Sequence, residues 1–457
     1  MKQVCLFLIY TLLFTTIQAE VKKTPIENSK LYWEIKKDTL IVSGKGIMPQ
    51  YDVTKPTPWH AHRHEIKSIE IKRGILSIGN YAFFNFPKLK SVVIPKGITI
   101  IGKNAFEGCS QLDEINLPVT TTYIGESAFF SCRNLKSIAI PKQIKTIEKG
   151  TFSYCILLSE VRFPDALVGI GESAFKGCIN LKTITIPKRV QTIGKEAFCG
   201  CTQLKEINLP ASLKRISQLA FYNCRDLETI TIPEGVVSIE EEAFRACSQL
   251  SEINLPNTLE IIEENVFSNC DNLRSIVIPK GVKEIHENCF WECKKLTSIT
   301  VHENNPYYSS FDCIIYNKMR TILVLCPAGR AGKITYPKEL KVIGYSAFAY
   351  CSQLTEIELP NTVEHIEEKA FFHCENLETV GLPEGFKVIG RKAFERCSEL
   401  NTVRIPNTLE RVEEFAFANC CRLLPFVVPE HTFVSENAFN EDITQVSCCS
   451  GEHCSHE

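Results

Sequence analysis

The residues of this chain with the most conspicuous chemistry are its cysteines, of which there are 22 among 457 residues. Cysteine thiolates bind soft metals such as zinc, and pairs of thiols oxidise to disulfides. Most of the cysteines recur every 23 residues with one longer gap: Cys109, Cys132, Cys155, Cys178, Cys201, Cys224, Cys247, Cys270, Cys293, Cys351, Cys374, Cys397 and Cys420. Equivalent positions of a repeat project in the same direction, so neighbouring thiols would not turn toward each other as the S–S torsion requires. We therefore predict a column of buried thiols, with disulfides within the column or a bound metal as the alternatives.

The remaining cysteines and the histidines form three further groups. Cys313 and Cys326 flank a non-repeated segment, where they form either a bridge or two free thiols. His60, His62 and His64 alternate with other residues, and in a strand their imidazoles would share one face and could hold zinc. Solvated imidazoles are the simpler interpretation, and we predict no metal site. A Cys/His cluster in the last ten residues is either a soft-metal site or a tail with local disulfides or free thiols: Cys448, Cys449, His453, Cys454 and His456.

Catalytic motifs are missing from the sequence. It contains no His-Glu-x-x-His zinc motif, no Gly-x-Ser-x-Gly elbow and no Gly-rich loop ending in Lys and Ser or Thr. Carboxylate runs such as Glu240–Glu242 recur at one position of the repeat, as a solvated surface does, whereas a catalytic acid/base pair is a unique place. The formal net charge of −2 offers no basic surface for nucleic acid. We predict neither an enzyme nor a cofactor.

The elements that must position these residues follow a phenylalanine that recurs every 23 residues, with one step of 58 residues. The positions are Phe83, Phe106, Phe129, Phe152, Phe175, Phe198, Phe221, Phe244, Phe267, Phe290, Phe348, Phe371, Phe394 and Phe417. A fixed period of this length indicates stacked coils, each too small to bury a core alone and covered by its neighbours. The sequence therefore predicts a solenoid with an insertion of 35 residues between Phe290 and Phe348.

The local structure of one coil follows from the spacing of its apolar residues. Ile115 and Leu117 alternate with polar neighbours, which is the period of a short half-buried strand, and Pro118 ends that strand because it has no N–H to donate. The Ala-Phe-x-x-Cys-x-x-Leu segment places apolar groups at i, i+1, i+4 and i+7, which favours one or two helical turns facing inward. We predict a strand, a turn, a short second extended piece and a helical turn in each coil.

These units carry a resemblance to a known family. The Leu-x-x-Ile-x-Ile-Pro and Ile-Gly-x-x-Ala-Phe-x-x-Cys units resemble the leucine-rich repeats of BspA-like bacterial surface proteins over residues 66–440. Residues 33–49 with Trp59 resemble that family's entry cap, and residues 305–329 resemble its hairpin between blocks of repeats, with Cys313 where the family has Gly. The resemblance implies an α/β leucine-rich-repeat solenoid of about 14–15 coils, with a parallel sheet on one face, short helical turns on the other, an N-terminal cap and one β-hairpin insertion.

The ends of the chain differ from the repeats. Lys2 precedes a long apolar run, and Ala19 lies where a signal peptidase would cut. No later apolar run approaches the ~20 residues of a membrane span, so we expect a secreted or cell-surface protein with no integral membrane segment after signal cleavage. The predicted parts are a signal peptide, a cap, the solenoid with its hairpin region, and a tail: residues 1–19, 20–65, 66–440 with 297–336, and 441–457.

Outward positions of the predicted strands alternate in type from coil to coil. The first outward residue is Glu in one coil and Ser or Thr in the next, so the repeating unit is 46 residues rather than 23. Carboxylates on alternate coils lie about 10 Å apart instead of about 5 Å, which reduces their repulsion, and the hydroxyls between them can donate hydrogen bonds. The pattern serves either to keep a sheet soluble or to bind an extended ligand such as a fibrous protein or a glycan.

Two classes of function compete. The resemblance implies adhesion or another protein or glycan interaction at or outside the cell surface, because the family is associated with binding to host and matrix proteins. The alternative is a structural or spacer protein of the cell envelope without a specific ligand. Aromatic residues are common interface anchors, so the candidate ligand-binding residues combine outward strand positions with hairpin tyrosines: Glu114, Asn116, Glu160, Arg162, Glu206, Asn208, Glu252, Asn254, Tyr307, Tyr308 and Tyr316.

Overall fold

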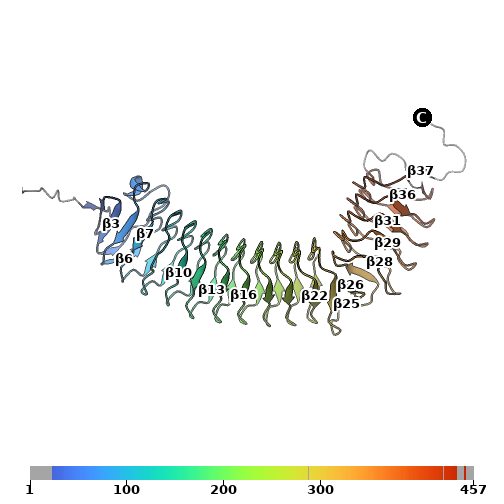
Figure 1. Ribbon diagram of the computed structural model, residues 1–457, viewed down its shortest axis with the longest axis horizontal. Helices are drawn as coiled ribbons and strands as arrows, with labels where there is room; N and C mark the ends of the chain where they lie inside the picture. Colours follow the sequence, from blue (N-terminus) through green and yellow to red (C-terminus); the bar gives the residue numbers. More distant parts are fainter. Residues whose placement is uncertain (1–22, 287, 426, 440–446, 449–457) are drawn as a thin grey trace, which may run out of the picture.

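The chain winds into a long curved stack of coils (Figure 1). The computed structural model describes residues 23–286, 288–425, 427–439 and 447–448. Each regular coil contributes a short first strand and a shorter second strand, so that two columns of strands run along the stack. The predicted signal peptide and the side chains of the predicted Cys/His tail lie outside the described residues.

The first-strand column carries one buried apolar residue between two outward ones in a typical strand, as at Ile184 between Thr183 and Thr185. Its strands are β5 (Ser68–Ile71), β7 (Ser91–Val93), β10 (Ser137–Ala139), β12 (Glu160–Arg162), β14 (Thr183–Thr185), β16 (Glu206–Asn208), β18 (Thr229–Thr231), β20 (Glu252–Asn254), β22 (Ser275–Ile278), β24 (Ser298–Val301), β29 (Glu356–Glu358), β31 (Thr379–Gly381), β33 (Thr402–Arg404) and β35 (Val427–Val428), which pairs with β37 (Ser447–Cys448). Residues 111–118 form no strand, although their alternation predicts one; Ile115 is nevertheless buried.

Pairing along the first-strand column has a period of two coils in the middle of the stack. β10 pairs with β12, β14 with β16, β18 with β20 and β22 with β24, and each of these pairs is a separate parallel sheet. Three of the four sheets join a strand that starts with Ser or Thr to the next one, which starts with Glu. The hydrogen-bonded ladder thus has the 46-residue period of the outward residues.

The second-strand column forms longer sheets because its pairing continues across more coils. Its strands are β6 (Ile75–Ile78), β8 (Ile100–Ile101), β9 (Tyr123–Ile124), β11 (Thr146–Ile147), β13 (Gly169–Ile170), β15 (Thr192–Ile193), β17 (Arg215–Ile216), β19 (Ser238–Ile239), β21 (Ile261–Ile262), β23 (Glu284–Ile285), β27 (Ile322–Leu325), β28 (Val342–Ile343), β30 (His365–Ile366), β32 (Val388–Ile389), β34 (Arg411–Val412) and β36 (Phe433–Val434). It is this column that holds neighbouring coils in register over the greatest length.

The Ala-Phe-x-x-Cys segment of each coil forms tight turns, and the predicted helical turns are not observed there. Asn104 and Gly108, two residues before and after Phe106, adopt left-handed conformations with φ of 54° and 73°. Because left-handed residues interrupt the turn, N–H groups point along the stack. The N–H groups of Phe106 and Gly108 donate to the carbonyls of Ala128 and Phe130 in the next coil, both at 2.8 Å. A helix would use the same N–H groups within its own segment, so hydrogen bonds between coils replace it. We call this turn segment the corner of the coil.

Phenylalanine rings and cysteine thiols fill the interior beside the corners. Successive rings stack in parallel, as for Phe129 and Phe152, whose centroids are 5.5 Å apart with an interplanar angle of 1°. The thiol of Cys132 donates to the carbonyl oxygen of Phe106 in the preceding coil at 3.2 Å, and the other column thiols repeat this contact in most coils. All described cysteines are free thiols, including Cys313 and Cys326, and the column is fully buried. The predicted column of buried thiols is confirmed, and the thiol of each coil satisfies a carbonyl of its neighbour.

The N-terminal end of the stack is closed by Trp59. β2 (Leu31–Lys36) and β3 (Thr39–Gly44) form a hairpin, flanked by β1 (Thr24–Pro25) and β4 (Gly46–Ile47), and β3 pairs in parallel with β5. The indole of Trp59 stacks on Phe83 at 5.9 Å, and its Nε1 donates to the carbonyl of Ala82 at 2.9 Å. In the next coil the equivalent carbonyl accepts the N–H of a phenylalanine. Trp59 therefore supplies both the ring and the donor that a preceding coil would have supplied.

The insertion forms a hairpin of β25 (Tyr308–Phe311) and β26 (Ile314–Asn317). Its two-residue turn, Asp312 and Cys313, is left-handed at both positions, with φ of 50° and 61°. Two φ values of this sign match the right-handed twist of a hairpin, so the tight turn forms with Cys313 where the resembling family has Gly.

The hairpin divides the stack into an N-terminal block and a C-terminal block. Buried apolar residues form two clusters that meet at β26, where Ile315 belongs to the first and Ile314 to the second. The continuous phenylalanine stack of the first block runs to Phe290, and that of the second begins at Phe348. Figure 1 shows the stack changing direction between β25 and β28. The two blocks therefore have separate buried clusters, which share β26 and also touch through side chains such as Trp291 and Tyr350, whose ring centroids are 4.7 Å apart.

Candidate functional site

The outward side of the first-strand column is the surface that the sequence singles out. Glu206 and Asn208 project to solvent on either side of the buried Ile207, and the same arrangement recurs two coils later. All eight residues predicted to bind a ligand from the strand pattern are exposed, although Glu114 and Asn116 lie in a segment that forms no strand: Glu114, Asn116, Glu160, Arg162, Glu206, Asn208, Glu252 and Asn254. We call this surface the first-strand face.

One hollow of about 240 Å³ opens on this face in the N-terminal block. Its floor is Ser137 and Ala139, and its two walls hold four of the predicted residues: Glu114, Asn116, Glu160 and Arg162. Side chains on neighbouring coils are about 5 Å apart, so a strand with short outward side chains between two with long ones leaves a depression. Arg162 donates from Nε to Glu160 Oε1 at 2.7 Å within its own strand. We call this depression the Ala139 hollow.

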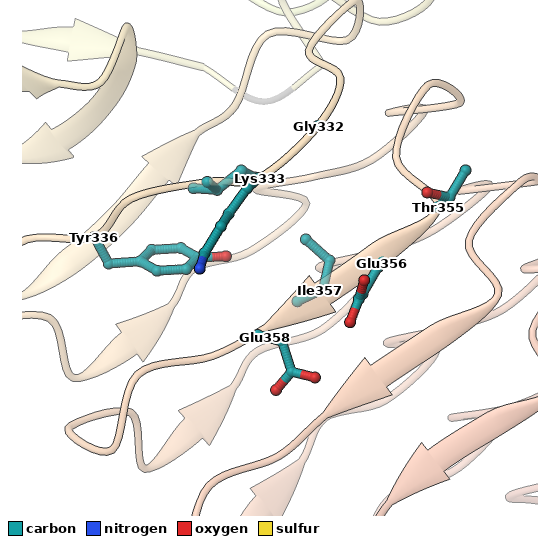
Figure 2. A pocket seen from close by; sticks show the side chains of 8 residues that line it. Gly332, Lys333, Tyr336, Thr355, Glu356, Ile357 and Glu358 are labelled. Carbon is teal, nitrogen blue, oxygen red and sulfur yellow. The ribbon is translucent and has the colours of Figure 1, made fainter.

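A second hollow of about 240 Å³ lies on the same face in the C-terminal block, next to the loop that leaves the insertion. Figure 2 shows Lys333 and Tyr336 on one side of it and Glu356 and Glu358 of β29 on the other. The hydroxyl of Tyr336 is buried without a hydrogen-bond partner. Burial raises the pKa of Tyr336 well above its usual value, which keeps the phenol neutral. We call this depression the Glu356 hollow.

An ion pair crosses the strand beside the Glu356 hollow. Glu358 on β29 reaches over β31 to Arg404 on β33, two coils away. This path is open because the intervening residue is Gly381, where an added Cβ would lie 2.7 Å from Cδ of Glu358. Both side chains are about half exposed, so solvent screens the pair and its contribution to stability is small.

A known family matches this chain over the same repeats. A model of the BspA type leucine-rich repeat region matches residues 60–182, 168–297 and 330–444. The chain belongs to the BspA-type leucine-rich repeat family. No curated protein matches it.

Solved structures similar to this BspA-type chain include a leucine-rich repeat protein from Bacteroides ovatus, with 26% identity, a TM-score of 0.57, and coverage of 92% of this chain and 99% of that one. A leucine rich cell surface protein from Faecalibacterium prausnitzii has 20% identity and a TM-score of 0.35, with 94% and 96% covered. Repeats of this kind are generally non-enzymatic scaffolds, and the family match suggests a role in protein interaction.

The three hairpin tyrosines of the BspA-type chain do not form one exposed group. Tyr307 is 48% exposed, but Tyr316 is fully buried, which corrects the expectation that it contacts a ligand. Tyr308 is half-buried, and its hydroxyl accepts the N–H of Ile285 at 3.3 Å. Buried and exposed residues do not alternate along β26, because the first block covers one face of the strand and the second block covers the other. Only Tyr307 of the three remains a candidate for surface recognition.

Sequence reasoning missed the C-terminal half of the first-strand face. Lys333 and Tyr336 lie on a loop after the insertion, which has no repeat position to reveal them. A usable signal was present at Gly381, since it is the single Gly at an outward strand position, where Thr, Asn, Val or Ala is usual. A missing side chain on a sheet face marks a place where a neighbour lies across the strand.

The histidines predicted as solvated do not lie on a strand. η1 (His60–His62) is a short 3₁₀ turn, so the shared face on which a three-histidine zinc site depends is not formed. Among the residues that the structure describes, there is no group of three or more His, Cys, Asp or Glu side chains placed to hold a metal ion. Nor does that part of the chain contain a helix with the length and apolar character needed to cross a membrane.

Proposed function

We propose that this BspA-type protein is exported and binds a protein or glycan at or outside the cell surface through its first-strand face. The observation that carries the proposal is the pair of hollows, one in each block, on the face where charged side chains flank short ones. A surface that only confers solubility has no reason to place cavities of about 240 Å³ between its charges. Binding sites are typically concave, with a few polar groups that fix the orientation of the ligand.

The spacing along the face fits an extended polypeptide. Glutamates at outward positions recur on alternate coils, about 10 Å apart. A peptide in the polyproline II conformation has three residues per turn and advances about 9 Å per turn, so along the stack it would place every third residue beside a carboxylate. Basic side chains at that interval complement Glu114, Glu160, Glu206 and Glu252, and the hydroxyls of Thr183 and Thr229 lie between these positions. This favours a protein over a glycan as the ligand.

The proposal is tested by arraying matrix proteins and glycans against the purified protein, then measuring the selected ligand by surface plasmon resonance. Glu206→Lys with Glu252→Lys reverses charge on the first-strand face, and we expect binding to weaken at least tenfold. Glu284→Lys is the matched control, because Glu284 is exposed on the second-strand column. Equal affinity in the face variant and the control would remove this face as the site and favour the spacer function.

A further inference from the structure

The second-strand column is interrupted where the two blocks meet. β23 ends one sheet and β27 belongs to the next, and no described strand pairs with both. A cavity of about 200 Å³ lies at this seam. Apolar side chains from both blocks line most of it: Ile285, Phe290 and Trp291 from the first, and Ile322, Val324 and Leu325 from the second. We call it the seam cavity; it is separate from the first-strand face.

Two polar atoms in the seam cavity have no partner. The hydroxyl of Ser346 is buried and makes no hydrogen bond, and its residue is only 9% exposed. Oδ1 of Asn288 is likewise buried and unpartnered. Buried polar atoms in folded proteins nearly always have a partner, and leaving one without is costly. Ser346 and Asn288 both line the cavity, and each holds a buried side-chain oxygen without a hydrogen-bond partner.

The other polar groups around the cavity are already engaged. Glu367 accepts the backbone N–H of Tyr345 at 2.8 Å through Oε2, and His286 lies 3.3 Å from the carboxylate of Glu284. No Lys or Arg side chain is among the described residues that line the cavity. An anionic ligand would meet the Glu367 carboxylate with no cation to balance it, so the cavity disfavours an anion.

We propose that the seam cavity binds a small uncharged aromatic molecule carrying one hydroxyl or N–H group, of the size of a phenol or an indole. An apolar cavity of about 150 Å³ holds benzene, so a volume of about 200 Å³ accepts a ring with one substituent. The ring contacts Trp291 and Val324, and its polar group bonds with Ser346 Oγ. This inference is independent of the proposed function, because the two sites lie on different strand columns.

The test uses 4-fluorophenol as the probe and the purified full chain, with ¹⁹F NMR line broadening followed through a titration. We expect saturable broadening by the unmodified protein and weaker binding of 4-fluorotoluene, which lacks the hydroxyl. Val324→Phe fills the cavity and abolishes binding. Ser346→Ala weakens binding about tenfold, because one hydrogen bond to the probe is lost.

Ser127→Ala is the matched control for Ser346→Ala. Ser127 holds the same position in its own coil, with φ of 51° against 50° at Ser346, so both substitutions place Ala in an equally strained backbone. Absence of saturable broadening by the unmodified protein would overturn the proposal, as would unchanged binding by a folded Val324→Phe variant. Should circular dichroism show that Val324→Phe is unfolded, equal affinity in Ser346→Ala and Ser127→Ala overturns it instead.

Discussion

The N-terminal and C-terminal blocks each place a short outward residue between longer ones of the two neighbouring coils on the first-strand face, and the longer side chains then pair differently. In the N-terminal block, Ala139 lies between Asn116 and Arg162, and Arg162 turns to Glu160 of its own strand. In the C-terminal block, Gly381 lies between Glu358 and Arg404, which pair across it. The methyl group of Ala139, which Gly381 lacks, and the charge of Glu358, which Asn116 lacks, therefore decide whether an ion pair bridges the face. Identical coils can carry different surfaces because the packing beneath does not depend on the outward residues.

Alkaline pH gives the largest expected effect, because each coil holds a buried thiol. Burial raises the pKa of Cys109 from 9.0 to about 12. Above pH 9 the unfolded chain loses thiol protons that the folded chain keeps, so the free energy of unfolding falls by about 1.4 kcal/mol per thiol for each pH unit up to the folded pKa. Both blocks should lose stability between pH 9 and pH 12, as urea unfolding at a series of pH values will measure.

Substituting the thiols of one block sharpens that comparison. We expect only the C-terminal block to lose this pH dependence when the column cysteines whose pKa burial raises there are replaced by Ala: Cys351, Cys397 and Cys420. Hydrogen exchange with peptide-level resolution separates the two blocks. A pH dependence that persists unchanged in the C-terminal block contradicts the assignment to the thiols.

Removing one stacked ring tests whether the blocks are separate packing units. Phe394 is fully buried between Phe371 and Phe417. Phe394→Ala should destabilise the C-terminal block by about 3–5 kcal/mol, as a large core truncation does. Hydrogen exchange should rise around the substitution and stay unchanged before residue 290. Phe198→Ala is the matched variant in the other block, and an equal loss of protection across both blocks in either variant would show a single cooperative core.

Trp59→Phe keeps a ring on the phenylalanine stack but removes the donor to Ala82. The unpaired carbonyl should cost about 1–3 kcal/mol and loosen the first coils of the N-terminal block alone, as urea unfolding and hydrogen exchange will report. Trp33→Phe is the control, because Nε1 of Trp33 has no hydrogen-bond partner to lose. If the two substitutions destabilise equally, the indole N–H of Trp59 is not the cap.

Gly381→Ala gives the smallest effect and acts on the difference between the two faces. The added methyl group displaces Glu358 from Arg404, at a cost of up to about 1 kcal/mol that shrinks with added salt. The reverse change, Asn116→Glu with Ala139→Gly, should create the same bridge to Arg162. A double-mutant cycle at low and high salt measures both pairs. A coupling energy that salt does not change would rule out a screened ion pair.

Sequence sufficed for the period and the buried columns of this protein and failed at the corner and where the repeat is interrupted. The period of Phe198 and its equivalents predicts the stack and the buried thiols, because every coil meets the same neighbours. It did not predict the corner, since apolar spacing cannot tell a helix from turns that bond to the next coil. The burial of Tyr316 and the place of Lys333 beside a hollow were not predicted either. Both depend on how the two blocks meet, which no local sequence pattern shows.

The corner gives the stack a direction. The N–H of Phe106 donates forward to Ala128, and the next corners repeat this, so aligned peptide dipoles run along each block. At the N-terminal end, the indole N–H of Trp59 donates to the carbonyl of Ala82. Each new coil presents N–H donors whose carbonyl acceptors belong to the coil that follows. The stack can therefore form in one direction. A chain that folds from its N-terminal end can add each coil to a completed one, and the last coil formed always presents N–H donors to the next.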